Sequence, residues 1–248
     1  MKRIVADWEL QSLKEKCLEI VVEKGDTDKE LQQLLISEEK EFDYIVVKVP
    51  VKSIHINSIL AQLGYVFSET QFTVGKQVSQ DIINNPYYHY FSKKINEYEI
   101  RTKNEISLLF NQIDDTMFIT DRISLDPNFG PFISSMRYKN WITNELNNNN
   151  SSVYLIYIKE NIVGFFLIKR DIISKTISSI LGGVFPDNKN KGYGMTIIIG
   201  PLSIALGEGF RHLVTKISSN NFEVFRLYNS LNFDIIEMCY VYTKHVNR

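Results

Sequence analysis

The chain of 248 residues has few of the residues that build metal sites and disulfide frameworks. It contains two cysteines, Cys17 and Cys239, which are far apart in the sequence and have no metal-ligand neighbours, and its four histidines are scattered. No HExxH, GxSxG or Walker pattern occurs. This scarcity argues against a zinc site and predicts a reduced, cytoplasmic protein without a bound metal.

Long apolar runs and an excess of one charge are also missing. No apolar stretch approaches the length of a membrane span. The N-terminal segment MKRIVADWELQSLKEK lacks the apolar region of a signal peptide, so none is expected. The net charge of −1 at pH 7 favours neither nucleic acid nor a membrane as a partner. The hydrophobic content of 44% is enough for ordinary protein cores.

Regular sequence patterns divide the chain into two units. We expect residues 1–97 to form a small N-terminal α/β domain with a linker, and residues 98–248 to form a larger domain. Residues 78–97 mix polar and aromatic side chains with a proline, which fits a linker or a loop that faces the substrate. The final strand, over 233–242, is expected to offer an edge for pairing.

Hydrophobic periodicity predicts a mixed α/β (α+β) fold for the second unit. Its helix over 102–113 begins with a capping box formed by Thr102 and Glu105, and a hairpin turns at 159–161. Gly200-Pro201 lies inside the helix that ends near 206 and should kink or shorten it. The other predicted elements are strands at 98–101, 175–185, 213–217 and 233–242, a helix over 133–147, and a helix capped by Asn220 or Asn221.

One segment of the first unit resembles the end of the second at a constant offset of 168 residues, which separates Lys48 from Lys216. At the same offset Leu60 matches Tyr228, and Glu69 matches Glu237. Both segments predict a strand, a helix, a tight turn and a strand. The first unit is therefore either a degenerate partial copy of the second or a chance likeness between two β-α-β pieces.

The most informative stretch is the loop VFPDNKNKGYG, residues 184–194, which joins a predicted strand to the apolar run MTIII. Glycines let the backbone approach a ligand, and the N–H groups at a helix start point at anions, so the loop could hold a pyrophosphate. A dinucleotide fingerprint needs a glycine where Ile197 stands. An ATP-binding loop needs lysine after Gly192, where Tyr193 stands. A plain surface turn is the other interpretation.

The loop resembles the signature of the GNAT acyltransferases, V-x-P-x-x-Q/R-x-x-G-x-G/A. Val184, Pro186, Gly192 and Gly194 are in register with it, while Lys189 replaces the usual glutamine or arginine and loses its planar geometry. The element order over 98–248 is also similar to that of the family. The resemblance implies a GNAT fold, a mixed and mostly antiparallel sheet flanked by helices, with acetyl-CoA or another acyl-CoA as co-substrate.

The resemblance also implies a cofactor site. The strand end at Gly183 and Val184 would offer N–H groups to the pantetheine and to the oxyanion of the reaction. Asn221, at the start of a later helix, would touch the cofactor. The pyrophosphate would lie on a run of loop residues: Lys189, Asn190, Lys191, Gly192, Tyr193 and Gly194.

Tyr228, seven residues after Asn221, would be the general acid that protonates the thiolate leaving group. A core tyrosine is the alternative, because Tyr228 shares an apolar helix face with leucine and valine. No general base can be assigned from the sequence. Asp121, Asp187 and Glu99 are candidates, and a chain of water molecules is equally plausible.

Across most of its length the chain is similar to the GNAT enzymes that acetylate dTDP-linked amino sugars such as dTDP-fucosamine. This implies transfer of an acetyl or 3-hydroxyacyl group to a nucleotide-linked amino-dideoxyhexose, for surface polysaccharide synthesis. Arg122 and Arg137 would contact the phosphates, and Phe129, Tyr138 and Trp141 would stack on a base or sugar, with surface arginines and core aromatics as the alternative. The resemblance also implies a homodimer. A GNAT acting on a protein or small-molecule amine, and a non-catalytic acyl-CoA-binding module, are the alternatives.

Overall fold

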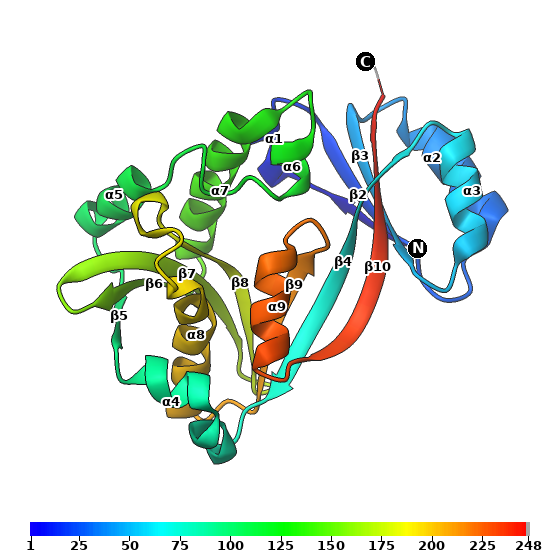
Figure 1. Ribbon diagram of the computed structural model, residues 1–248. Coiled ribbons are helices and arrows are strands. Elements are labelled where there is room, and N and C mark those ends of the chain that lie inside the picture. Colours follow the sequence, from blue (N-terminus) through cyan, green and yellow to red (C-terminus); the bar gives the residue numbers. More distant parts are fainter. Residues whose placement is uncertain (247–248) are drawn as a thin grey trace.

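The computed structural model describes residues 1–246, whose strands form one ten-stranded sheet in the order β1-β2-β3-β10-β4-β9-β8-β7-β6-β5 (Figure 1). Within that part of the chain, only the pairs β2–β3 and β8–β9 are parallel. The strands are β1 (Lys2–Val5), β2 (Cys17–Val21), β3 (Tyr44–Pro50), β4 (Val66–Gln77), β5 (Ile95–Glu99), β6 (Ser151–Ile158), β7 (Asn161–Asp171), β8 (Thr176–Val184), β9 (His212–Ser218) and β10 (Asp234–His245).

Helices cover both faces of this sheet. They are α1 (Asp7–Leu13), α2 (Asp28–Glu38), α3 (Ile54–Gln62), α4 (Pro86–Ser92), α5 (Lys103–Gln112), α6 (Arg122–Leu125), α7 (Gly130–Leu146), α8 (Thr196–Gly207) and α9 (Phe222–Ser230). Short 3₁₀ turns occur at η1 (Gln80–Asn84), η2 (Pro186–Asn188) and η3 (Tyr193–Met195).

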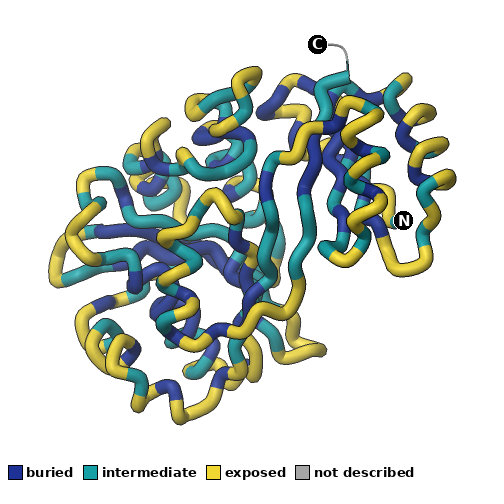
Figure 2. The backbone as a smooth tube through the Cα atoms, turned by 45° about the vertical axis from the view of Figure 1, so that its right-hand side comes forward, coloured by how far each residue is buried: buried dark blue, intermediate teal, exposed yellow. Residues whose placement is uncertain are grey.

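Successive strand residues point to opposite faces, and this alternation separates the cores. Phe166 packs with α8, α9 and α4, whereas its neighbour Phe165 packs under α5 and α7. In the same way Val47 packs under α2 and α3, and Val46 packs under α1 and α6. Figure 2 shows the buried positions concentrated along the strands and the exposed positions on the outer faces of the helices.

The resemblance between the two halves of the chain is a true structural repeat. The unit β3-α3-β4 and the unit β9-α9-β10 have the same bounds when 168 is added to each residue number of the first. Gln71 of β4 pairs with Cys239 of β10, and these are equivalent positions of the two copies. A pseudo-two-fold axis therefore passes between Gln71 and Cys239.

The two copies exchange their last strands. β10 lies between β3 and β4, and β4 lies between β10 and β9, so each copy's final strand pairs with the first strand of the other. The pairing is symmetric, because Pro50 faces Cys239 in one copy and Ser218 faces Gln71 in the other. The division into 1–97 and 98–248 stays a proposal, and the sheet is continuous across it.

Two expectations based on the sequence are wrong. The final strand is not an edge, because β10 pairs with β3 on one side and with β4 on the other. The segment 78–97 is not an irregular linker or loop, because it forms η1, α4 and the start of β5. Tyr88 of α4 is buried in the core against α8, where its hydroxyl accepts a hydrogen bond from Ser203 at 3.3 Å.

Two local predictions for the second unit are confirmed. Thr102 and Glu105 form the predicted capping box, and Asn221, not Asn220, caps α9. α8 continues through Pro201 to Gly207, so the proline does not shorten the helix. Gly200 has a packing role, since a Cβ there would lie 2.4 Å from the Phe166 ring.

Candidate active site

The centre of the site is a fork between two parallel strands. β8 pairs with β9 from Thr176–His212 as far as Ser179–Thr215, and β8 then continues to Val184 paired only with β7. Within residues 1–246, the side of 180–184 that faces away from β7 therefore has no strand partner. Free N–H groups on this edge can bind an extended ligand or a developing oxyanion.

Tyr228 of α9 lies at the point where the fork opens. Its side chain is 5% exposed, and its hydroxyl is within hydrogen-bonding reach of Ser179 and Thr215, the last paired residues of β8 and β9. Burial raises the pKa of Tyr228 to about 12. The aromatic ring packs edge-on against Phe233, with ring centroids 4.9 Å apart. A protonated hydroxyl is thus fixed beside the unpaired strand edge.

The loop between β8 and α8 has the backbone form of an anion-binding nest. Asn190 and Gly192 both have positive φ, 62° and 80°, which turns successive N–H groups toward one side. No hydrogen bond from the N–H groups of 190–192 is found in the described part of the chain. Gly194 then lets the loop pack on α9, since a Cβ there would lie 2.9 Å from Leu227 Cδ1.

The polar side chains around the loop already make some hydrogen bonds within the protein. The ammonium of Lys189 donates to the backbone carbonyl of Thr116. Lys191 reaches Asn188 Oδ1 at 3.5 Å. Asn221 uses Oδ1 to accept the N–H of Val224 at 3.3 Å as the cap of α9. An anion at this loop would therefore meet mainly backbone N–H groups, with the lysines adding positive charge around them.

The two arginines predicted to bind phosphate have different environments. Arg137 of α7 makes hydrogen bonds of 2.6–2.9 Å with both carboxylate oxygens of Glu9, on α1. Burial would raise the pKa of Glu9, but Arg137 outweighs burial and the net effect lowers it. Arg122 of α6 has no ion pair in the described residues, and its buried Nε lacks a hydrogen-bond partner. Of the two arginines, Arg122 is the one with a donor, its Nε, that has no hydrogen-bond partner within residues 1–246.

Two of the predicted stacking residues, Tyr138 and Trp141, lie next to each other on α7, whereas the third, Phe129, packs against Tyr44 and His245. Tyr138 is buried, and its ring lies 4.1 Å from that of Phe118. Trp141 stacks on Tyr138 with an interplanar angle of 19°, and it also lines a pocket between α1 and α7. Tyr138 is thus a core residue, whereas Trp141 has a surface available to a ligand.

Of the three carboxylates considered as general bases, two already accept hydrogen bonds within the protein and the third is exposed. Asp121 caps α6 and accepts a hydrogen bond of 2.6 Å from Ser134. Glu99 of β5 accepts from Ser152 and Arg101. Asp187 is exposed in η2. The sequence overlooked a fourth carboxylate, Glu69.

Glu69 lies on β4 and is 3% exposed, and its carboxylate makes no hydrogen bond or ion pair within residues 1–246. It pairs with Val241 and so shares the sheet face that α1 and α6 cover. Its charge acts on Arg122 and Tyr138. Its equivalent in the other copy, Glu237, is exposed. The offset of 168 had matched these two residues, but nothing in the sequence indicated which one would be buried.

No protein-family model and no curated protein matches the chain. Solved structures do match. A GCN5-related N-acetyltransferase from Sphaerobacter thermophilus aligns at TM-score 0.65 and 11% identity, over 94% of this chain and 74% of that one. A second such enzyme, from Kribbella flavida, aligns at TM-score 0.58 and 11% identity, over 92% and 81%.

A tandem GNAT protein of the clavulanic acid biosynthesis pathway also aligns, at TM-score 0.58 and 9% identity, over 94% of this chain and 76% of that one. The chain therefore has the GNAT fold, and this confirms the fold class that the loop motif predicted. Among the described residues, no helix has the length and apolarity required to cross a membrane.

Proposed function

We propose that the protein is an acyl-CoA-dependent N-acyltransferase with acetyl-CoA as its default donor. The observation that carries this proposal is the fork of β8 and β9, with the hydroxyl of Tyr228 at its opening and a nest of free N–H groups at its far end. An extended, pyrophosphate-bearing thioester would fit both features. The GNAT fold of the chain supports the same assignment.

The residues of the loop and strand fit coenzyme A in two parts. The N–H groups of 190–194 and the start of α8 would hold the pyrophosphate. The free edge of β8, through Gly183 and Val184, would pair with the amides of pantetheine. A Cβ at Gly183 would lie 2.5 Å from Met117 Cε, so the glycine leaves room for the Met117 side chain beside this edge.

Bound acyl-CoA would supply the thioester carbon that the acceptor amine attacks, and CoA would leave as the thiol. N–H groups on the free edge of β8 would stabilise the carbonyl oxygen as it gains negative charge. The amine would attack in its neutral form, and the proton that its nitrogen then loses would pass to solvent. Tyr228 would donate its phenolic proton to the leaving sulfur and regain one from solvent. With a pKa of about 12, Tyr228 stays protonated at neutral pH and is ready to act as the acid.

We infer that the acceptor is a dTDP-linked amino-dideoxyhexose of surface polysaccharide synthesis. Two groups under α6 support an acceptor that carries both a cation and an anion. Arg122 has an unpartnered Nε that would donate to a phosphate, and the carboxylate of Glu69 would bind the ammonium of the sugar. Arg137 is committed to Glu9, so the phosphate contact falls to Arg122. A homodimer remains part of this proposal, and β1 and β5 are the edges of the sheet.

The test is an acceptor panel. The purified protein is incubated with acetyl-CoA and, separately, with dTDP-amino sugars, peptide amines and small polyamines, while thiol release is followed. We expect thiol release only with the nucleotide sugars. Turnover with peptide or small amines alone would reject the sugar acceptor and keep the acyltransferase. Binding of CoA without turnover on any amine would reject catalysis and leave an acyl-CoA-binding module.

A further inference from the structure

The chain contains two tryptophans, and both line one pocket of about 380 Å³ between α1 and α7. Trp8 belongs to α1 and is 51% exposed, and Trp141 belongs to α7 and is half-buried. A cavity of this size is in the range of small-ligand sites. The other lining residues are Glu9, Ser12, Arg137, Asn144, Glu145 and Asn148.

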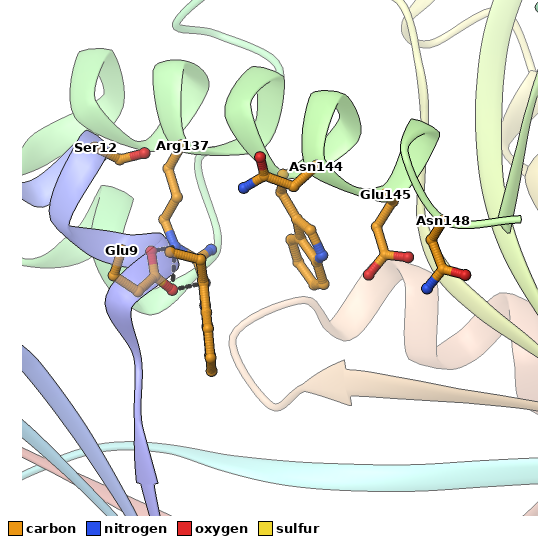
Figure 3. A pocket seen from close by; sticks show the side chains of 8 residues that line it. Glu9, Ser12, Arg137, Asn144, Glu145 and Asn148 are labelled. Atoms are coloured by element: carbon orange, nitrogen blue, oxygen red, sulfur yellow. Dashed lines mark hydrogen bonds and ion pairs between the residues drawn. The ribbon is translucent and has the colours of Figure 1, made fainter.

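Each charged side chain that lines the pocket already has a charged partner, within the lining or beside it. Figure 3 shows Arg137 and Glu145 pointing from α7, and Asn148 from the turn after it, into the pocket, where Arg137 meets Glu9 of α1. Glu145 accepts a hydrogen bond of 2.6 Å from Ser151 and lies 4.0 Å from the ammonium of Lys169. No cation of the lining is left over for a phosphate. The part of a ligand that enters is therefore uncharged.

The remaining surfaces are aromatic faces and neutral polar edges. The guanidinium of Arg137 lies 5.5 Å from the centre of the Trp141 ring and holds that indole in place. The amide of Asn144 makes no side-chain hydrogen bond within the described residues, so its donor and its acceptor are both free. An indole face together with a free amide suits a flat ring with hydrogen-bonding substituents.

We propose that this pocket binds an uncharged polar six-membered ring, a pyrimidine or a pyranose. The ring lies against Trp8 and Trp141, and Asn144 and Asn148 bind its polar edge. That this ring is part of the acyl acceptor rests on the proposed function, whereas the binding itself does not. The charged groups of such an acceptor lie outside the pocket, toward Arg122 and Glu69, since the lining itself offers no free ion.

Both halves of the chain build this site. Trp8 and Glu9 come from the N-terminal unit, and Arg137 and Trp141 come from the GNAT-like unit. The pair of Arg137 and Glu9, together with a hydrogen bond of 2.9 Å from Asn140 to Ser12, fixes α1 on α7. The added N-terminal unit therefore supplies specificity, because the pocket has only one wall without it.

Intrinsic fluorescence tests the proposal directly, because every tryptophan of the chain lines the pocket. The full-length protein is titrated with thymidine, uridine and methyl pyranosides in the absence of CoA. We expect saturable changes in emission with one of the two ring classes, which identifies the ring. No saturable change with either class up to millimolar concentration would overturn the proposal.

Matched variants exclude an indirect effect. Trp8→Ala should weaken binding about tenfold, which is typical of one lost stacking partner. Leu10→Ala, at an exposed position of the same helix outside the pocket, should not weaken it. Asn144→Ala should weaken binding and its exposed neighbour Thr143→Ala should not; binding to these variants is read by calorimetry. Equal affinities for all four variants would contradict the proposed site.

The outcomes separate this inference from the proposed function. If the acceptor panel gives turnover but Trp8→Ala leaves the KM for the acceptor unchanged, the pocket is not an acceptor site and the acyltransferase stands. If rings bind but no amine is acylated, the pocket stands and the acyltransferase fails.

Discussion

The two copies of the strand-helix-strand unit have the same lengths and opposite roles. In the C-terminal copy, β8 continues past its last pairing with β9 and leaves a free edge over 180–184. In the N-terminal copy, β2 ends at Val21, which still pairs with Lys48 of β3, and the N–H of Val22 also donates to Lys48. Within the described residues, a fork therefore exists only in the C-terminal copy, where β8 continues beyond its last pairing with β9.

The side chains of the two copies also differ at the equivalent positions. Leu60 occupies the position of Tyr228 and is fully buried, so the N-terminal copy has no hydroxyl at this point. The loop before α2 contains Glu23 and Asp26, which bind the N-terminal ammonium, and a capping box at Thr27 occupies the helix start. The start of α2 is thus already capped by the protein itself, whereas the loop at 189–194 is the one that we propose binds an anion. The C-terminal copy provides the candidate chemistry, whereas the N-terminal unit provides a strand of the sheet and one wall of the pocket between α1 and α7.

The largest expected effect comes from separating the two copies. A fragment of residues 98–248 lacks β4, so β9 and β10 lose the strand that joins them. We expect this fragment to be unfolded or aggregated and inactive, as judged by circular dichroism and thiol release. Addition of a separately produced 1–97 fragment should restore some activity. A folded, active 98–248 fragment would show that the exchange of strands is dispensable.

Next in size is the loss of the hydroxyl at the fork. Tyr228→Phe should lower kcat about 100-fold, which is typical of a general acid, and should leave the Kd for acetyl-CoA unchanged. Because the pKa of Tyr228 is raised to about 12, the wild-type rate should not fall through loss of this proton as pH rises to 10.

Tyr88→Phe is the control for this change. It removes a buried hydroxyl that bonds Ser203 of α8, away from the fork. Its kcat should equal that of the wild type. An unchanged kcat for Tyr228→Phe across pH would remove Tyr228 from the mechanism.

The buried carboxylate gives a smaller effect and a control inside the repeat. Glu69→Gln keeps the shape of the side chain and removes the charge, so we expect the KM for the acceptor to rise about tenfold, the loss of one charged hydrogen bond. Glu237→Gln changes the equivalent, exposed residue and should leave the KM unchanged. Equal effects in the two variants would show that burial of Glu69 has no role in binding.

The smallest effect concerns the lysines of the loop. Lys189→Ala and Lys191→Ala should each raise the KM for acetyl-CoA about two- to fivefold, since exposed charges contribute little. The increase should shrink in high salt because the interaction is screened. Lys24→Ala, in the corresponding loop of the other copy, is the control and should leave the KM unchanged. A loss of binding of 100-fold or more would mean that the side chains, not the backbone, hold the pyrophosphate.

Local patterns in the sequence predicted local structure well. The capping box at Thr102, the hairpin at 159–161 and the loop before α8 depend on neighbouring residues, so the sequence reveals them directly. The repeat was visible as an offset of 168 because both copies conserve the same spacing of strand and helix.

The sequence did not reveal which residues far apart in the chain would contact one another. Arg137 looked free for phosphate because its partner, Glu9, is 128 positions away. The insertion of β10 between β3 and β4 depends on which strands pair, and both edges of a strand have the same backbone groups. Burial of Glu69, as opposed to Glu237, depends on helices that cover one end of the repeat only.

The number and place of coenzyme A sites test the central claim most directly. Calorimetric titration of the full chain with acetyl-CoA, followed by hydrogen exchange of the complex, gives both. We predict one site per chain, with protection at 180–184 and 190–194 and none at 22–27. Two sites per chain, protection at 22–27, or no protection at the fork would contradict the assignment of the candidate chemistry to the C-terminal copy.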